Sequence, residues 1–414
     1  MTKKKLVISA VVVGFCLFND NKPCADSRFF PWYQKPSGRT IEKRSFFQTD
    51  LFFITAGSAY GVSGREKKSI AELQGIYDLK KLSDAVIALG LTSPLLAQWQ
   101  MSQANIEWNS RQKVEGQGIR IQSDVRFLRG LSFGFSTGIM ALNSDISFSL
   151  TRAKKNDMGL TTAQEEELDR ERRAMHDLLG LSDTHWSQTF FTDTRLQARL
   201  GGVWDYRLKS RQVDAAIFSG LFIPSGAKRY KNNPASLPFG GNGLTGFFVG
   251  TELNLELRED MFLGLFIELS KRFAKQQDVR IPMKKEPLYF GATSGNIEID
   301  PGVTVHFNPS LTFGDVQGPF GVGLSYHLTH HAQDVLTDMR ADKTILIDWG
   351  NMKTVSMWNS EYISLTVFYD SGRVIRRESW QPIITFGWDI PVKFIAAEDV
   401  SKTHNISFGI DIRF

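Results

Sequence analysis

Apolar side chains recur at every second residue in long stretches, and this alternation constrains the fold more than any other feature of the chain. In "PIITFGWDIPVKF" the apolar residues Ile384, Phe386, Trp388 and Ile390 alternate with small or polar ones. A period of two residues is that of a β-strand, whose successive side chains point to opposite faces. Most of the chain is therefore expected to form strands with one apolar and one polar face.

The length of these strands distinguishes between two all-β folds. A soluble β-sandwich also alternates, but its strands average about five to six residues. Strands here run past ten residues, which is long enough to cross a bilayer. In a bilayer every backbone polar group must be paired within the protein, so the strands must close on themselves. We therefore expect an all-β fold, a single closed antiparallel transmembrane β-barrel.

The alternating stretches predict about twelve strands, an even number, as is usual for barrels made from one bacterial chain. They lie near residues 46–58, 112–128, 130–150, 187–208, 211–225, 243–258, 260–275, 294–307, 317–331, 354–370, 381–395 and 403–414. The barrel thus takes residues 46–414, with long loops near 59–111, 151–186, 226–242, 276–293 and 332–353. Long loops of such barrels are extracellular and short turns periplasmic. This parity predicts a periplasmic N-terminal segment, residues 26–45.

Two of the long extracellular loops carry helical patterns. A capping box from Thr162 to Glu165 and a glycine stop at Gly180 predict one helical insertion. The first loop carries many apolar residues, of which six are candidates for a constriction or plug: Val86, Ile87, Leu89, Leu91, Leu95 and Leu96. Because such residues need cover, we expect the loop to fold into the barrel, to pack over its rim or to pack on a neighbouring subunit of an oligomer.

The N-terminus predicts export. Lys3, Lys4 and Lys5 precede an apolar run that is too short to span a bilayer as a helix, as in a secretory signal peptide. We expect residues 1–25 to be this signal, and they contain both cysteines of the chain, Cys16 and Cys24. The net charge of +5 is too small to indicate nucleic acid as a partner.

The chain ends on the stretch "HNISFGIDIRF", in which Phe408, Ile410, Ile412 and Phe414 share one face. This ending resembles the assembly signal of bacterial outer-membrane β-barrel proteins, a class that includes porins and other channels. The resemblance implies insertion into the outer membrane of a cell with two membranes. It also implies two partners, the outer-membrane lipid and the barrel-assembly machinery.

The polar faces of the strands segregate by charge. Five arginines lie on one set of strands and five acids on another: Arg120, Arg126, Arg195, Arg199 and Arg413, and Glu252, Glu256, Glu268, Glu298 and Asp300. These are the candidate pore-lining residues. Facing arrays of opposite sign would select solutes by charge. The alternative is that the same residues form ion pairs that fill a closed lumen.

The sequence predicts a non-enzymatic protein without cofactor or metal. His327 and Thr329 are two residues apart, as in some barrel lipid hydrolases, but threonine is a poor substitute for serine. His330 and His331 have no suitably spaced carboxylate for a metal site. We predict a channel for passive or weakly selective passage of small polar solutes. The alternatives are a transporter of hydrophobic compounds gated by an inward-folded loop 59–111, and a non-conducting structural barrel.

Overall fold

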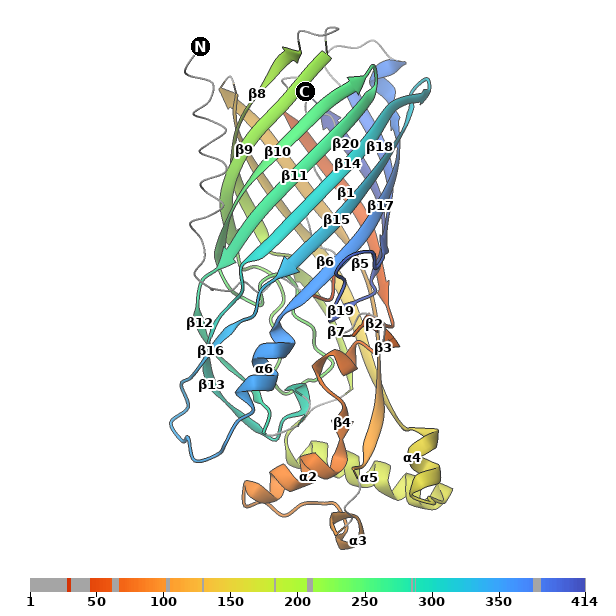
Figure 1. Ribbon diagram of the computed structural model, residues 1–414, viewed down its shortest axis with the longest axis vertical. Coiled ribbons are helices and arrows are strands. Elements are labelled where there is room, and N and C mark those ends of the chain that lie inside the picture. The colour runs from red at the N-terminus through yellow and green to blue at the C-terminus, as the bar shows by residue number, and fades with distance from the viewer. Residues whose placement is uncertain are drawn as a thin grey trace.

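A computed structural model describes the chain over residues 28–30, 45–61, 67–101, 105–128, 130–181, 184–206, 211–283, 286, 288–374 and 381–413. Within these residues the fold is a β-barrel that continues at one end into a large extension (Figure 1). The predicted signal peptide, residues 1–25, lies outside the described residues.

Twelve strands form the barrel. They are β1 (Phe46–Ala56), β5 (Glu107–Leu128), β6 (Leu131–Leu150), β8 (Thr194–Tyr206), β9 (Arg211–Ile223), β10 (Gly246–Arg258), β11 (Met261–Arg272), β14 (Thr304–Gln317), β15 (Phe320–His331), β17 (Trp358–Asp370), β18 (Gln381–Pro391) and β20 (His404–Arg413). Neighbouring strands pair antiparallel, and β1 pairs with both β5 and β20. Since β5 also pairs with β6, the sheet closes. The predicted closed twelve-strand barrel is confirmed.

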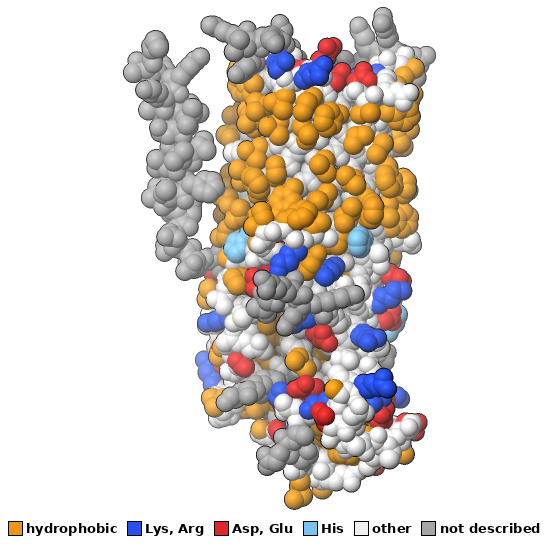
Figure 2. Space-filling view, turned by 45° about the vertical axis from the view of Figure 1, so that its right-hand side comes forward, with side chains coloured by type: hydrophobic (Ala, Val, Ile, Leu, Met, Phe, Trp, Pro, Cys, Tyr) orange, Lys and Arg blue, Asp and Glu red, His pale blue; other side chains and the backbone are white. Residues whose placement is uncertain are grey.

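Apolar side chains form a belt around the barrel. On the last strand, Phe408 and Ile410 point outward and are 50% and 44% exposed. Their neighbours Ser407 and Asp411 are buried and face inward, opposite Phe52 and Gln48 of β1. Figure 2 shows the apolar belt over the upper part of the molecule, with charged side chains at the rim above it and on the extension below. Such a belt is the lipid-facing surface of a membrane barrel.

The predicted assembly signal therefore has the orientation that the alternation requires, except at Phe414, which lies outside the described residues. Its recognition by assembly machinery stays a prediction. Over the described part of the chain, no helix has both the length and the apolar character needed to span a membrane.

Short and long connections lie at opposite ends of the barrel. Glu259 and Asp260 join β10 to β11, and Gly318 and Pro319 join β14 to β15. Gly318 adopts a φ of 62°, in the left-handed region that favours glycine. We call this end the turn end and the opposite one the loop end. The turn end corresponds to the periplasmic side of outer-membrane barrels.

The extension grows from the loop end. Strands β5 and β6 are 22 and 20 residues long and continue beyond the belt, where β4 (Tyr77–Asp78) and β7 (His185–Phe191) pair with them. Five helical segments lie with them: η1 (Ala71–Gln74), α2 (Leu79–Ala88), α3 (Ala97–Gln100), α4 (Arg152–Asp157) and α5 (Thr162–Leu178). Helix α5 is the predicted insertion. Its capping box uses Thr161 and Gln164, one residue before the predicted pair, and Gly180 follows its end with a φ of 62°.

Two small sheets complete the extension. The first contains β12 (Lys275–Ile281), β13 (Thr293–Asp300) and β16 (Val335–Asp338), with η2 (Leu288–Phe290) and α6 (Trp349–Ser356) beside it. Ile281, Ile297 and Met352 form its core. The second sheet contains β2 (Ala59–Tyr60), β3 (Lys67–Lys68) and β19 (Val400–Ser401). A short helix at the turn end, η3 (Ser371–Arg373), follows β17.

Two of the predicted strands differ from the observed ones. The predicted strand 187–208 is divided into β7 and β8 at buried Asp193, which accepts hydrogen bonds from Gly226 N and Gly241 N and pairs with Arg272 at 2.8 Å. The predicted strand 294–307 contains all of β13 and only the start of β14. The alternation keeps its phase across Pro301 and Gly302, so the sequence pattern gave no sign of the break. Residues 308–316, which connect the predicted strands 294–307 and 317–331, belong to β14.

Candidate functional site

The inward-facing arginines of the barrel meet acids in ion pairs. Arg195 binds Glu268 through two hydrogen bonds, Nη1 to Oε1 at 3.1 Å and Nη2 to Oε2 at 2.7 Å. Arg199 pairs with Glu252 and, at 3.3 Å, with Asp214. Because β9 and β10 separate β8 from β11, the Arg195–Glu268 pair links strands that are not neighbours. Charges of opposite sign therefore meet in pairs rather than lining separate walls.

The other candidate pore-lining residues are placed as follows. Arg120 pairs with Asp50 at 2.7 Å, Arg413 with Asp411 at 3.2 Å, Glu256 accepts a hydrogen bond from Gln212 N, and Arg126 donates to Leu128 O near the turn end. Glu298 and Asp300 were expected on a barrel strand, and this placement is wrong. Both belong to β13 of the extension, where Asp300 accepts a hydrogen bond from Lys271 Nζ at 2.7 Å.

Four phenylalanines fill the lumen beside the Arg195–Glu268 pair. Phe218, Phe222, Phe248 and Phe266 form a buried cluster, and the guanidinium carbon of Arg195 lies 3.9 Å from the centroid of the Phe248 ring. Such rings attract a cation electrostatically. The middle of the lumen is thus occupied on this side by paired charges packed against aromatic rings.

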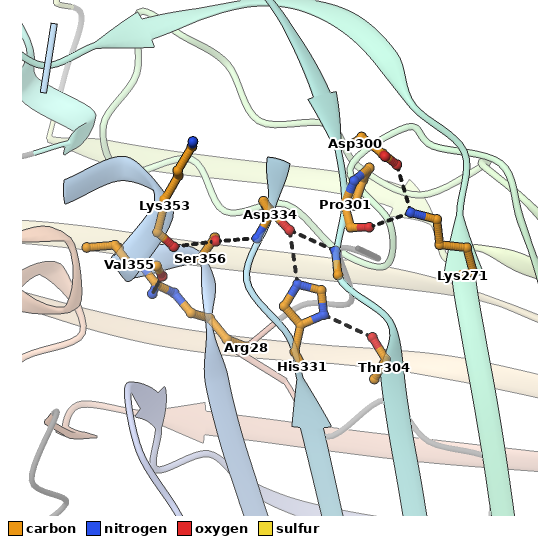
Figure 3. A network of polar contacts seen from close by, with 11 residues as sticks. Arg28, Lys271, Asp300, Pro301, Thr304, His331, Asp334, Lys353, Val355 and Ser356 are labelled. Atoms are coloured by element: carbon orange, nitrogen blue, oxygen red, sulfur yellow. Dashed lines mark hydrogen bonds and ion pairs between the residues drawn. The ribbon is translucent and has the colours of Figure 1, made fainter. Parts of the chain in front are cut away.

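A histidine network links β14 to β15 inside the barrel. Nε2 of His327 lies 3.1 Å from Ser325 Oγ, and its Nδ1 lies 3.0 Å from Asn308 Nδ2 and 3.3 Å from His306 Nε2. The sequence suggested Thr329 as the partner of His327, whereas the observed partners Ser325 and Asn308 were not predicted. The side chain of His331 points elsewhere, to Thr304 and Asp334 (Figure 3). We therefore interpret these contacts as a structural cross-link in the lumen.

A polar cavity of about 150 Å³ lies on the turn-end side of this network. Its lining includes Asp50, Arg120, Ser325, Asp411 and Arg413. Along β1, the inward-facing residues change from Gln48 and Asp50 at this level to Phe52 and Ile54 toward the loop end. The inward face of β1 therefore changes from polar to apolar, while its neighbour β20 keeps the buried polar residues Ser407 and Asn405 opposite Phe52 and Ile54.

Residues 28–30 lie at the loop end, and we call them the N-terminal plug. Phe29 and Phe30 are 3% and 5% exposed and belong to one apolar core with Phe52 and Ile54. The carbonyl oxygen of Phe29 accepts hydrogen bonds from Ser401 Oγ at 2.7 Å and Thr403 Oγ1 at 2.6 Å.

The predicted periplasmic position of the N-terminal segment is wrong for residues 28–30, because β1 begins at the turn end and these residues contact the loop end. The remainder of segment 26–45 is described only at residue 45. One signal in the sequence could have located the plug: two adjacent phenylalanines precede the first strand in a stretch without alternation.

Helices α2 and α3 of the first loop do not enter the lumen, which corrects the predicted inward folding for this part of the loop. Its helices α2 and α3 lie at the tip of the extension, far from the belt (Figure 1). Val86 and Leu95 are buried there in a core with Leu168 and Met175 of α5. Of the other candidates, Leu89 is partly buried, and Ile87, Leu91 and Leu96 are 43–47% exposed. The apolar residues of α2 and α5 thus share a core within the extension, so these helices do not need the lumen as cover.

A histidine in this core predicts a pH effect. His176 of α5 is 7% exposed, and its Nε2 lies 2.8 Å from Tyr77 Oη. Burial lowers its pKa to about 3, and the charges of Arg172 and Arg280 act in the same direction, against Asp169. The unfolded pKa is about 6.5, so His176 contributes stability that is present above pH 6.5 and is lost as pH falls toward 3.

We expect the stability difference between wild type and His176→Gln to shrink as the pH falls from 6.5, by about 1.4 kcal/mol per unit. Hydrogen–deuterium exchange of α5 peptides, compared at equal pH, measures this difference. Burial raises the pKa of Glu171 and of Glu286 to about 7, but both are present in the two proteins and cancel. A difference that does not vary with pH would contradict this prediction.

A second and larger cavity, of about 410 Å³, lies between the plug and the sheet β12–β13–β16. We call it the loop-end cavity. His331 of β15 and Trp358 of β17 contribute to its lining, so it lies directly beyond the barrel mouth. Arg28 borders it and donates a hydrogen bond to Val355 O at 2.7 Å, and Ser356 donates to Lys353 O (Figure 3). Of these residues, only His331 was considered from the sequence, as a metal ligand, and none was expected to line a cavity.

No family model matches the chain, and no curated protein matches its sequence. Among solved structures, an outer-membrane channel from Pseudomonas putida is similar with a TM-score of 0.47 and 8% identity, over 92% of this chain and 100% of that one. The toluene transporter TbuX from Ralstonia pickettii has a TM-score of 0.33 and 7% identity, over 90% and 89%. A FadL homologue from Pseudomonas aeruginosa has a TM-score of 0.32 and 9% identity, over 90% of each chain.

The class of the protein follows from its own structure. A closed antiparallel barrel satisfies all of its strand edges, and its apolar belt matches the hydrocarbon layer of a bilayer. The protein is an integral outer-membrane β-barrel of twelve strands.

Proposed function

We propose that the barrel is a channel for small polar solutes and that the N-terminal plug closes it in the state described. The observation that carries this proposal is the polar cavity of about 150 Å³ between the inward faces of the strands, together with residues 28–30, which are buried at the loop end of the same barrel. The inward faces of the strands thus carry polar groups, and the plug is a segment at the loop end that does not belong to the barrel wall.

The plug is held in a way that permits its release. Ser401 and Thr403 donate hydrogen bonds to backbone carbonyls of the plug, Arg28 donates to Val355 O and Leu73 O, and the two phenylalanine rings add apolar contact. A short segment can leave such a site without breaking the barrel, because none of the described plug residues belongs to a strand. Small segments that order and disorder are a common way of switching a protein.

Planar-bilayer recordings test this function directly. We expect discrete conductance steps, and vesicles containing the protein should admit small sugars faster than large ones. The absence of steps and of sugar uptake, both in the wild type and in a variant without the plug contacts, would reject the channel.

The second candidate is a non-conducting structural barrel. It is favoured by the ion pairs Arg195–Glu268 and Arg199–Glu252, which together with the phenylalanine cluster occupy the middle of the lumen. In that case removal of the plug contacts would leave the bilayer silent. A transporter gated by inward folding of loop 59–111 is not proposed, because α2 and α3 lie away from the lumen.

A further inference from the structure

We infer that the loop-end cavity binds a small amphipathic organic anion, with its acidic group among Arg28, Arg229 and Arg280 and its apolar body against the sheet β12–β13–β16. This inference rests on the proposed channel function, for which the cavity would be the first binding site at the extracellular mouth. Binding itself can be measured independently of conductance.

The first argument is charge. The cavity lining contains six basic residues and two acidic ones: Arg28, Lys228, Arg229, Lys231, Lys275 and Arg280, and Asp278 and Asp334. Lys231 pairs with Asp278, and Asp334 accepts a hydrogen bond from Gly302 N and contacts His331. Asp334 also attracts Arg28, and Asp278 attracts Arg280. Because the basic residues outnumber the acids six to two, the lining still has an excess of positive charge.

The hydrogen bonds that position Arg280 and Arg28 run to carbonyl oxygens, which carry no net charge. Arg280 donates hydrogen bonds to the carbonyl oxygens of Lys231, Gly291 and Leu179. Arg28 donates to Val355 O and Leu73 O. Carbonyl groups fix the position of a guanidinium but do not cancel its charge. Both arginines are thus held at the cavity by neutral acceptors, with Asp399 as the strongest acidic influence on Arg28 and Glu286 as that on Arg280.

Arg229 is the least satisfied of the three. Its guanidinium lies over the ring of Tyr289, and its Nη1 atom is buried without a hydrogen-bond acceptor among the described residues. A buried donor without an acceptor is costly. Burial lowers the pKa of Arg229 well below its ordinary value, and the nearby charge of Arg28 acts in the same direction. An anion between Arg28 and Arg229 would relieve both effects.

The second argument is the apolar side of the cavity. Val279, Ile297, Ile299 and Leu336 of the small sheet line it together with Met352. A volume of about 410 Å³ is within the range of ligand sites, about 300–1,000 Å³. An inorganic anion would leave this apolar surface in contact with water, whereas an anion with an aromatic or aliphatic body would cover it. The lining therefore favours an amphipathic ligand over a simple ion.

Isothermal titration of the full-length protein in detergent tests the site, with 1-naphthoate as the probe. The neutral alcohol 1-naphthalenemethanol has the same rings without the charge, and inorganic phosphate has charge without the rings. We expect saturable binding of naphthoate and binding of the other two that is at least about tenfold weaker. Equal binding of naphthoate and the alcohol would indicate partition into detergent and would overturn the inference, as would equal binding of naphthoate and phosphate.

Variants locate the binding in the cavity. Arg229→Gln should weaken naphthoate binding by about tenfold or more, because it removes a charged donor from the site. Arg173→Gln is the matched control, since Arg173 is an exposed arginine of α5 outside the cavity lining, and it should bind as the wild type does. Unchanged affinity in Arg229→Gln would overturn the assignment.

Two further measurements keep the result interpretable. If Arg229→Gln does not fold, as judged by heat-modifiable migration in gels, Lys228→Gln serves instead, because Lys228 is exposed and lines the cavity. It should also weaken naphthoate binding, and unchanged affinity would count against the site. Conductance steps in a protein that binds no naphthoate would reject the anion site and leave the channel intact. Naphthoate binding in a protein that shows no conductance would support the anion site and reject the channel.

Discussion

Replacing Phe29 and Phe30 together with alanine should raise the current through the barrel at least about tenfold. Truncation of a buried phenylalanine costs about 3–5 kcal/mol, and each 1.4 kcal/mol changes an equilibrium about tenfold. Both rings are almost fully buried, and the centroids of Phe30 and Phe239 are 5.2 Å apart. The docked plug therefore loses most of its apolar contact, while the barrel strands are unchanged. Single-channel recording in planar bilayers measures the open fraction directly.

The matched control removes two phenylalanine rings from the outside of the barrel. Phe247 and Phe273 are 42% and 49% exposed, and their ring centroids are 6.0 Å apart. Their double replacement with alanine should leave the current at the wild-type level. If the plug variant is folded and inserted but conducts no more than this control, the N-terminal plug is not the closing element.

The second large effect concerns the pair Arg195–Glu268. Either Arg195→Met or Glu268→Leu leaves an uncompensated charge in the lumen, and loss of one partner from a buried pair costs about 3–5 kcal/mol. The side chains are only 10% and 8% exposed, so water screens the remaining charge little. The double variant removes both charges, and its stability should return close to that of the wild type. Urea unfolding in lipid vesicles, followed by tryptophan fluorescence, measures all four proteins.

The same cycle on Lys113 and Glu115 is the control. These side chains are 66% and 54% exposed, so their coupling should be close to zero. Additive effects of Arg195→Met and Glu268→Leu would show that the lumen is wet enough to screen the pair. That result would contradict the expectation that water is excluded from the pair, which we draw from the packing of Arg195 against Phe248.

Sequence reasoning succeeded where the signal was local and periodic. The alternation around Ile384 and Phe408 identified barrel strands, because lipid on one side and a polar lumen on the other impose a period of two. It failed at β13 and β14, since the same period continues through Pro301 and Gly302 although the chain leaves the barrel there. Period alone cannot tell whether an apolar face is covered by lipid or by protein.

The sites were harder to predict than the strands. The candidate charges were identified by type and face, and eight of the ten lie on barrel strands, all except Glu298 and Asp300. Their pairing was not predictable, because Arg195 and Glu268 are 73 residues apart and are brought together by closure of the barrel. Arg229 and Arg280 gave no signal, since an arginine in a loop is ordinarily solvated.

The sequence by itself determined the class of fold, the number of strands and the orientation of the last strand, because each of these depends on local alternation and on the length needed to cross a bilayer. Only the tertiary structure decided that residues 28–30 are buried at the loop end, that the inward-facing arginines meet acids in pairs and that a basic cavity lies beside the plug. These features depend on contacts between distant segments. Such contacts arise from the covering of apolar surface and the pairing of charge in three dimensions, which leave no periodic trace along the chain.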